Sequence, residues 1–243
     1  MEYRANFILW LLVEIAFVAV QVGMVSVYFN FTDNIAGWTK PQVFLLIGIF
    51  RVIEGIFHMF FFQNLLNFPE NISTGNMDLF FTRPVNSLFL SSSRYHSLDE
   101  FGTFLVGIAL VWYSLIQLQF SFSLLLLFEL FVLFFFGLLT LYSIILIFSS
   151  LSFFFTRMTA LHSVYDVITK ALRIPINIIT KDSFIGNSLL FPLLIVATLP
   201  SQILLGYVTP IFITLEIIGS LAIFMVAHKF FYFALRHYSS ASS

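Results

Sequence analysis

Long apolar runs separated by polar stretches dominate the pattern along the chain. A membrane-spanning helix needs about 20 mostly apolar residues. Five runs meet or approach that length, namely residues 7–29, 41–66, 101–118, 122–155 and 211–233. The run 122–155 exceeds one bilayer thickness but contains no turn signal, so it predicts one long or tilted helix rather than two spans. A less apolar segment at 158–180 carries charges, and we count it as a spanning helix too, the fifth of six in chain order.

Two stretches interrupt this pattern and predict different structures at the two ends of the bundle. Residues 67–100 form the longest polar stretch and predict a large loop between the second and third spans. Residues 183–209 are apolar but are broken by glycine and proline at positions 186, 192, 200 and 206. Their pieces are too short for ordinary spans, so we expect a re-entrant pair of short helices before the last span. Backbone of this kind is tolerated only where protein or a wet cavity covers it.

Composition agrees with an all-α membrane protein built as a single domain over residues 1–243. The chain is 60% hydrophobic and only 9% charged, whereas a soluble domain carries about 25% charged residues. Its net charge of −1 provides no basic field for nucleic acid. It has no cysteine, which excludes disulfides, thiolate metal sites and a cysteine nucleophile.

Lysine and arginine in the loops predict the orientation. With a cytoplasmic N-terminus, the basic residues on the inner side are Arg4, Arg83, Arg94, Arg157, Lys229 and Arg236. Only Lys40 and Lys181 then lie outside. We therefore expect both termini and the 67–100 loop to be cytoplasmic, with residues 183–209 toward the outer face.

Charged residues inside the predicted spans are costly and are candidates for function. Arg51, Glu54 and His58 share one face of the second helix. The fifth helix presents a similar stripe made of His162, Asp166, Lys170 and Arg173. One interpretation is that these residues pair and brace the bundle, with Arg51–Glu54 and Asp166–Lys170 as ready pairs. The other is that they line a translocation pathway or an interface with a partner subunit. The lone histidines His96, His228 and His237 have no ligand-spaced neighbours, so no metal site is expected.

The chain carries no motif for binding ATP or for hydrolysis. None of its four lysines follows a glycine, so there is no Gly-Lys-Ser/Thr phosphate loop. It also has no Gly-x-Ser-x-Gly elbow and no His-Glu-x-x-His sequence. Any ATP-driven work must therefore come from another chain.

The polar loop carries a more specific signal. Gly75 to Asn86 reads Gly-Asn-Met-Asp-Leu-Phe-Phe-Thr-Arg-Pro-Val-Asn. It resembles the "G-x-x-D-x-x-L-x-R-P-x-N" loop of a bacterial group of ABC-2 type permeases that includes multidrug and viologen exporters, with Phe81 where that group has leucine. Three other places resemble the group in the same order: Tyr3-Arg4-Ala5-Asn6-Phe7, Arg173-Ile174-Pro175, and the tail from Tyr238 to Ser243.

This resemblance implies a type V ABC exporter-like fold in a bacterial inner membrane. It implies two copies of a separate ATPase, which would bind ATP and Mg²⁺, and a second permease, identical or homologous. In such permeases a short cytoplasmic helix between the second and third spans docks on the ATPase. The residues that would make this contact are Gly75, Asp78, Leu79, Phe80, Phe81, Arg83 and Pro84. The implied function is export of a hydrophobic or amphipathic compound.

Three alternatives remain open from the sequence. A proton-coupled secondary transporter would use the intramembrane Glu, Asp and His residues as a relay. A second alternative is a structural subunit that carries no transport activity, for which the helical bundle itself would be sufficient. A membrane enzyme is disfavoured because the usual catalytic motifs are missing.

Overall fold

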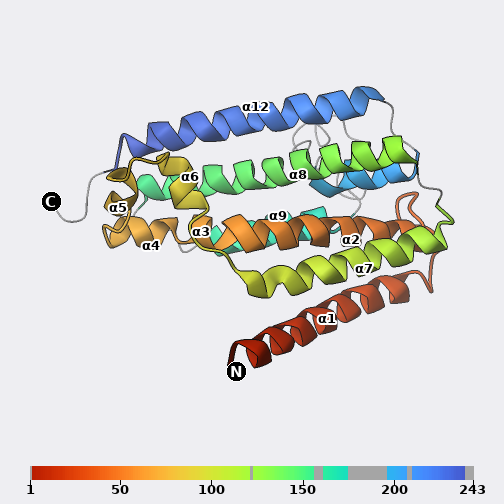
Figure 1. The fold of residues 1–243 in the computed structure, drawn as a ribbon. Helices are drawn as coiled ribbons and strands as arrows, with labels where there is room; N and C mark the ends of the chain where they lie inside the picture. The colour runs from red at the N-terminus through yellow and green to blue at the C-terminus, as the bar shows by residue number, and fades with distance from the viewer. Residues whose placement is uncertain (1, 121–122, 156–160, 175–195, 207–209, 239–243) are drawn as a thin grey trace.

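The computed structural model describes residues 2–120, 123–155, 161–174, 196–206 and 210–238, and their regular elements are helices (Figure 1). Four of the described helices are long and apolar enough to cross a membrane: Ile8–Tyr28, Lys40–Ser73, Leu127–Phe153 and Ile211–Leu235. Phe101–Gln117 is a shorter apolar helix. The chain is therefore an all-helical membrane protein with four candidate spans, and the count of six predicted from the sequence goes beyond what these helices show.

The first two long helices differ sharply in their surroundings. In α1 (Glu2–Tyr28), most side chains from Ile8 to Tyr28 are exposed, whereas α2 (Lys40–Phe57) is the centre of the protein. α2 begins at a capping box in which Thr39 and Gln42 satisfy each other's backbone N–H groups, with Pro41 in the first turn. It continues through a π-helical segment, η1 (His58–Phe62), into α3 (Gln63–Leu66). A π-helical turn inside an α-helix is rare and is often found at a functional site.

The polar loop folds into short helices at one end of the bundle. These are α4 (Phe68–Ser73), α5 (Asp78–Phe81), α6 (Ser87–Ser92) and the 3-10 turn η2 (Leu98–Glu100). Gly75 adopts φ +73° between α4 and α5, a left-handed conformation that favours glycine. The Asn86 side chain accepts a hydrogen bond from the N–H of Phe89 and caps α6.

The remaining helices complete the bundle. α7 (Phe101–Gln117) is followed by α8 (Leu124–Ser150), which continues into the 3-10 turn η3 (Leu151–Phe153) as one long helix. α9 (Leu161–Leu172) and α12 (Pro210–Leu235) follow. Residues 196–204 are also helical and largely buried. Residues 183–195 and 207–209 of the predicted re-entrant segment lie outside the described residues.

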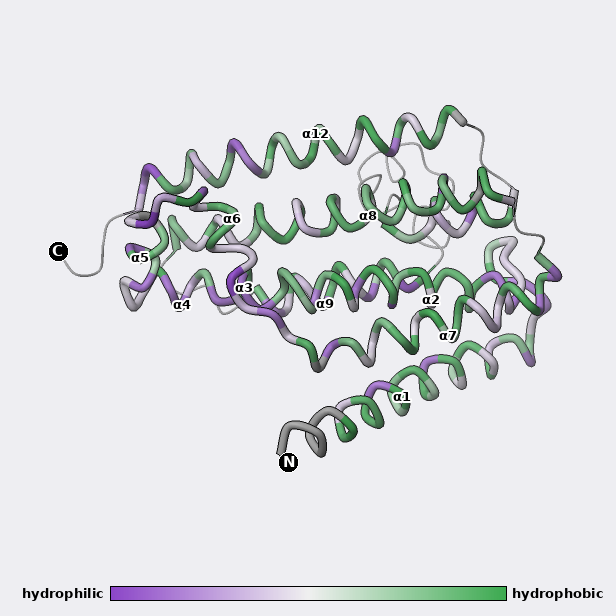
Figure 2. Tube along the Cα trace, in the orientation of Figure 1, coloured by the Kyte–Doolittle hydropathy of each residue, from purple (hydrophilic) through white to green (hydrophobic). Residues whose placement is uncertain are grey.

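Two helix pairs organise the packing: α2 lies along α7, and α8 lies along α12 (Figure 1). The core between them is built mainly from α2, where Leu45, Leu46, Ile47, Ile49 and Phe50 are fully buried. Many large apolar side chains of α1, α8 and α12 are exposed, and these helices carry mainly hydrophobic residues along their length (Figure 2). A surface of this kind suits lipid rather than water.

The fifth predicted span, 158–180, is represented by α9 alone. Its 12 residues rise about 18 Å, which is less than the hydrocarbon thickness of a bilayer. Residues 156–160 and 175–195 flank it and lie outside the described residues. α9 is also markedly more polar than the neighbouring helices, in keeping with the charged stripe seen in the sequence.

Candidate functional site

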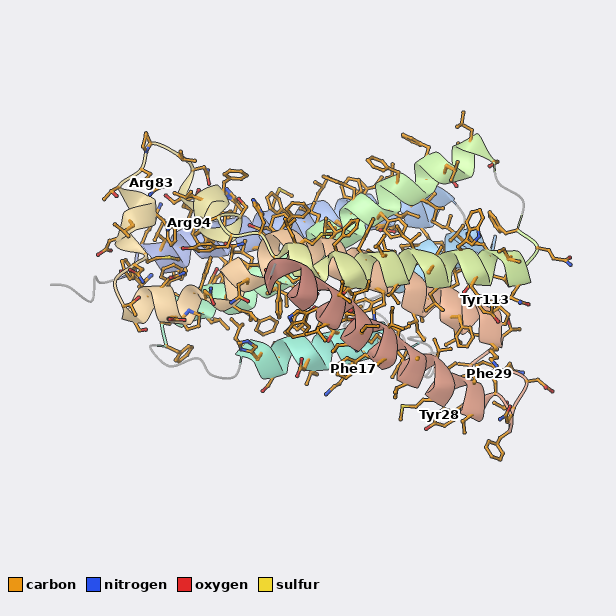
Figure 3. All side chains as sticks on the ribbon, turned by 60° about the horizontal axis from the view of Figure 1, so that its bottom comes forward. Phe17, Tyr28, Phe29, Arg83, Arg94 and Tyr113 are labelled. Atoms are coloured by element: carbon orange, nitrogen blue, oxygen red, sulfur yellow. The ribbon has the colours of Figure 1, made fainter. Side chains whose placement is uncertain are left out.

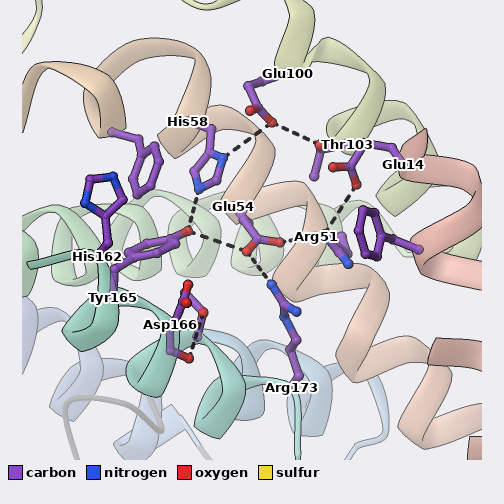
Figure 4. Close-up of a pocket in the computed structure, with 13 residues that line it drawn as sticks. Glu14, Arg51, Glu54, His58, Glu100, Thr103, His162, Tyr165, Asp166 and Arg173 are labelled. Atoms are coloured by element: carbon purple, nitrogen blue, oxygen red, sulfur yellow. Dashed lines mark hydrogen bonds and ion pairs between the residues drawn. The ribbon is translucent and has the colours of Figure 1, made fainter. Parts of the chain in front are cut away.

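A polar cavity of about 290 Å³ lies between α1, α2 with η1, the start of α7, and α9 (Figure 4). Because these helices are far apart in the sequence, only the folded chain brings their polar residues together. The cavity is lined by Glu14, Phe17, Arg51, Glu54, His58, Phe62, Glu100, Thr103, His162, Tyr165, Asp166, Thr169 and Arg173.

A buried carboxylate between two guanidinium groups forms the centre of the cavity wall. Glu54 is only 2% exposed. One of its oxygens accepts from Arg51 Nη1 at 3.0 Å and the other from Arg173 Nη2 at 2.7 Å. Arg51 Nη1 also lies 3.5 Å from Glu14 Oε2 on α1. This network ties α1, α2 and the end of α9 together, and the Arg51–Glu54 pair predicted from the sequence is confirmed.

A second branch of the network starts at the π-helical segment. His58 Nε2 lies 2.5 Å from the Tyr165 hydroxyl of α9, and His58 Nδ1 lies 3.4 Å from Glu100 Oε2. The Tyr165 hydroxyl also donates to Glu54 at 3.5 Å, which joins the two branches. A π-helical turn widens the local spacing of side chains, and here it sets His58 between a residue of α9 and a residue at the start of α7.

Glu100 lies just before α7, and neighbouring groups shift the pKa of its carboxyl in opposite directions. Burial raises its pKa, but the hydrogen bond and charge of His58, the Thr103 hydroxyl and the charge of Arg51 act the other way. The net result is a pKa below the ordinary value of 4.5. The carboxylate form of Glu100 is therefore stabilised by the cavity.

The residues at the rim of the cavity on α9 are less constrained. His162 and Asp166 are exposed, and neither makes an ion pair with another described residue. Lys170 is also exposed, but it does not line the cavity. The predicted Asp166–Lys170 pair is wrong, because the two groups do not come within 4.0 Å of each other in the described chain. On an exposed helical turn, long side chains gain little by pairing and remain solvated.

Six of the seven charged candidates from the sequence therefore meet at one cavity, and Lys170 does not. The sequence reasoning missed Glu100, Tyr165 and Thr103 as members of the site. Glu100 was assigned to the end of the polar loop, and a tyrosine in an apolar helix carries no distinctive pattern. Glu14 lies within the first predicted span, but nothing in the sequence shows which helix faces α1, so the sequence does not link Glu14 to the other charges.

The predicted coupling segment lies at one end of the bundle, where Figure 3 labels Arg83 and Arg94. Leu79 is 54% exposed and Arg83 and Pro84 are also exposed, so these residues are available for contact. Phe80 is only 3% exposed, and the guanidinium of Arg94 lies over its ring at 5.5 Å. The expectation that Phe80 offers an apolar contact on the surface is therefore wrong, because its ring is used inside the loop. The Phe81 side chain lies outside the described part of the structure.

The polar loop is fastened to the bundle next to the cavity. The Asn64 side chain accepts from the N–H of Tyr95 and donates to its C=O, both at 2.8 Å. The N–H of Ser97 donates to the C=O of Met59 in the π-helical segment at 3.0 Å. Together with the His58–Glu100 contact, these bonds join residues 95–100 to η1 and α3. A displacement of the loop would therefore reach the cavity directly.

Comparison with known proteins adds one match. A family model described as "ABC-2 family transporter protein" matches residues 15–242, which is nearly the whole chain. No curated protein and no solved structure matches the chain.

Proposed function

The chain belongs to the ABC-2 family of transporter proteins, and from this we propose that it is the permease subunit of an exporter driven by a separate ATPase. The membrane proteins of this family lack a catalytic ATPase domain, which agrees with the missing phosphate loop. The observation that carries the proposal is the family match over residues 15–242 of a chain with four candidate membrane-spanning helices. The compound it exports would be hydrophobic or amphipathic.

We further propose six passes of the membrane with both termini in the cytoplasm. The N-terminal end of α1, the C-terminal end of α12 and the α4–α6 helices lie at the same end of the bundle (Figure 1). Arg83 and Arg94 belong to this end (Figure 3), whereas Lys40 begins α2 at the opposite end. Excess arginine and lysine marks the cytoplasmic side. The α9 segment and the residues around 183–209 would supply the fifth pass and the outer gate.

A second permease is supported by the exposed polar face of α9. His162, Asp166 and Lys170 are exposed on a helix that would lie at membrane depth. Such groups are costly against lipid and normally face protein or a water-filled path. We infer that a second copy, or a homologous permease, lies across from α9 and that a polar pathway runs between the two chains.

The ATPase would dock on the short helices of the polar loop. Leu79 offers the exposed apolar side chain and Arg83 the charged rim contact, with Gly75 and Pro84 bounding the segment. Residues 95–100, which are joined to η1 and α3, would carry the resulting movement to the cavity. The movement would switch the helices between two packed arrangements.

The docking assignment is tested with the complex of this chain and its ATPase in proteoliposomes. Leu79→Asp and Asp78→Lys should lower ATP-driven transport by about tenfold or more. Each change removes one apolar or charged contact at the centre of the docking interface, and a loss of about 1.4 kcal/mol corresponds to a factor of ten. Phe89→Asp is the matched control, since Phe89 is 65% exposed on α6 but lies outside the Gly75–Asn86 segment. Equal losses in all three variants, or no loss in the first two, would contradict docking at this segment.

One observation favours a second candidate function. Glu54, Tyr165, His58 and Glu100 form a connected chain of hydrogen bonds and one ion pair, and each of these side chains can take up or release a proton, which is an arrangement suited to a proton relay. A proton-coupled secondary transporter would respond to an imposed pH gradient in vesicles that lack ATP. Transport that needs ATP and is indifferent to that gradient would exclude this alternative.

A further inference from the structure

We infer that Glu216 on α12 is a proton-binding site, a carboxyl that stays neutral while α8 and α12 are packed together and can release its proton only when they separate. The inference is drawn from the burial of this side chain, from its lack of a partner and from the residues around it. It does not depend on the proposed function, because Glu216 does not line the polar cavity and no ATPase is needed to test it.

Nothing in the described part of the chain compensates a negative charge on Glu216. The residue is 0% exposed, and neither of its carboxyl oxygens has a hydrogen-bond partner among the described residues. Burying an unpaired carboxylate costs so much free energy that such a group takes up a proton instead. A neutral carboxyl that lacks a hydrogen bond costs far less.

Glu54 shows the opposite case among the buried carboxyls of this protein. It is 2% exposed, almost as buried as Glu216, but it accepts hydrogen bonds from Arg51 at 3.0 Å and from Arg173 at 2.7 Å. Two guanidinium groups therefore balance the charge of Glu54, whereas no described cation contacts Glu216. Because the two carboxyls are buried alike, the lack of a cation is what distinguishes Glu216.

The contact between α8 and α12 encloses Glu216. Ser220 lies one turn later on the same face of α12, and its Oγ lies 2.7 Å from Thr140 Oγ1 and donates to the C=O of Phe136 at 3.2 Å. This face of α12 is therefore turned towards α8. The two helices run in the same direction (Figure 1), so Glu216 lies near the level of Leu133, which is fully buried on α8. A carboxyl at this level meets apolar packing rather than water.

The titratable residues of the neighbouring helices do not supply the missing positive charge. The main neighbours of α12 are α8 and η3, and their titratable residues are Glu129 and Tyr142, neither of which becomes a cation. Residues 196–206, which pack on α8, carry no titratable side chain. On α12 itself the first residue after Glu216 that can carry a positive charge is His228, about 18 Å further along the helix axis. A proton is therefore the ligand that suits this carboxyl.

Proton binding at Glu216 is linked to the packing of α8 against α12. A glutamate in water is ionised at about pH 7, so a rearrangement that admits water to this contact would make Glu216 release its proton. The proton must return before the two helices can pack closely again. At neutral pH the pair therefore exchanges a proton with water whenever it opens and closes, and its opening becomes easier as the pH rises.

Thermal unfolding of the full chain in detergent tests the inference by the sign of the effect. At pH 7, Glu216→Gln should raise the unfolding midpoint by about 2–4 °C or more, because the folded wild type must keep a proton that its unfolded chain releases. The gain should grow as the pH rises from about 5 to about 8. Glu216→Leu, which removes the carboxyl altogether, should behave in the same way. Glu129→Gln changes a half-buried carboxyl on α8 and is the matched control, for which no such gain is expected.

Infrared spectroscopy of the folded chain in nanodiscs of neutral phosphatidylcholine detects the proton directly. A protonated carboxyl has a C=O stretching band that a carboxylate lacks. At neutral pH the wild type and Glu129→Gln should show this band, and both Glu216 variants should lose it. Transfer to deuterium oxide should shift the band slowly, because water does not reach the group. A band of equal intensity in wild type and both Glu216 variants, an immediate shift in deuterium oxide, or midpoints in both variants below that of Glu129→Gln would each overturn the inference.

Discussion

At the scale of single residues, the protein concentrates its buried charge on one carboxylate. Glu54 holds Arg51 from its own helix and Arg173 from a segment 119 residues later in the chain. The pairing of Glu54 with Arg51 follows from their i,i+3 spacing on α2, whereas its pairing with Arg173, just after α9, cannot be read from the sequence. A buried network of this kind is stable only while all its members are paired. Glu54 is therefore the group that holds both arginines of the cavity in place.

Replacing Glu54 by glutamine should destabilise the protein by about 3 kcal/mol. The buried guanidinium of Arg51 and the partly buried guanidinium of Arg173 would lose their compensating charge. The measurement is unfolding of the purified chain in detergent, followed by tryptophan fluorescence. Glu70→Gln provides the control, since Glu70 is exposed on α4 and makes no ion pair in the described chain. A change in Glu54→Gln as small as that in the control would show that the network does not hold the helices together.

At the scale of helices, close contact between α2 and α7 positions the site. Added Cβ atoms at Gly48, Gly55 and Gly107 would lie 2.7–2.9 Å from atoms of the opposite helix, including its backbone. Small residues let helices in a membrane approach closely enough for van der Waals packing. Since α7 begins directly after Glu100, this crossing also sets the distance between Glu100 and His58. The glycines are visible in the sequence, but their role is not.

Gly107→Leu should separate α2 from α7 and destabilise the fold by about 2 kcal/mol or more, because the backbone of Val52 has no room to move aside. Gly23→Leu makes the same change on α1, where nothing lies within 4 Å of the added Cβ. Both variants are compared by thermal unfolding in the same detergent and by their yield after membrane extraction. If Gly23→Leu is as destabilising as Gly107→Leu, the loss reflects leucine in a helix rather than the crossing.

At the scale of the whole molecule, the two ends of the helical bundle differ in structure. The short helices α4–α6 lie at the end where α1 begins and α12 finishes (Figure 1), and the cavity lies between that end and the middle of the bundle. The contacts of residues 95–100 with η1 join the two regions through Glu100 and His58. The stability of this junction depends on the ionisation of Glu100.

The pH dependence of unfolding should reveal this junction. The folded pKa of Glu100 is below 4.5, so its contribution to stability is fully present above that pH and is lost as the pH falls through the folded pKa. Wild type should therefore exceed Glu100→Gln in stability at pH 7, and the difference should shrink as the pH falls below 4.5. Unfolding midpoints of both proteins across this range provide the measurement. A difference that stays constant with pH would show that the carboxylate charge contributes nothing.

The sequence alone determined that this is a helical membrane protein of the ABC-2 type without its own ATP site. Lipid cannot satisfy backbone polar groups, so long apolar runs can only be helices, and a missing phosphate loop is read directly from the residues. It also identified most of the charged residues of the cavity, because charge at membrane depth is conspicuous.

Only the tertiary structure decided which of those charges meet. The rotation of each helix and the angle at which two helices cross depend on side-chain packing, for example where Gly107 of α7 contacts α2. The apolar periodicity of a single helix does not reveal which other helix it packs against. For this reason Asp166 remained free of Lys170, Phe80 was found inside the loop, and Glu100 and Tyr165 joined a site that no local pattern had marked.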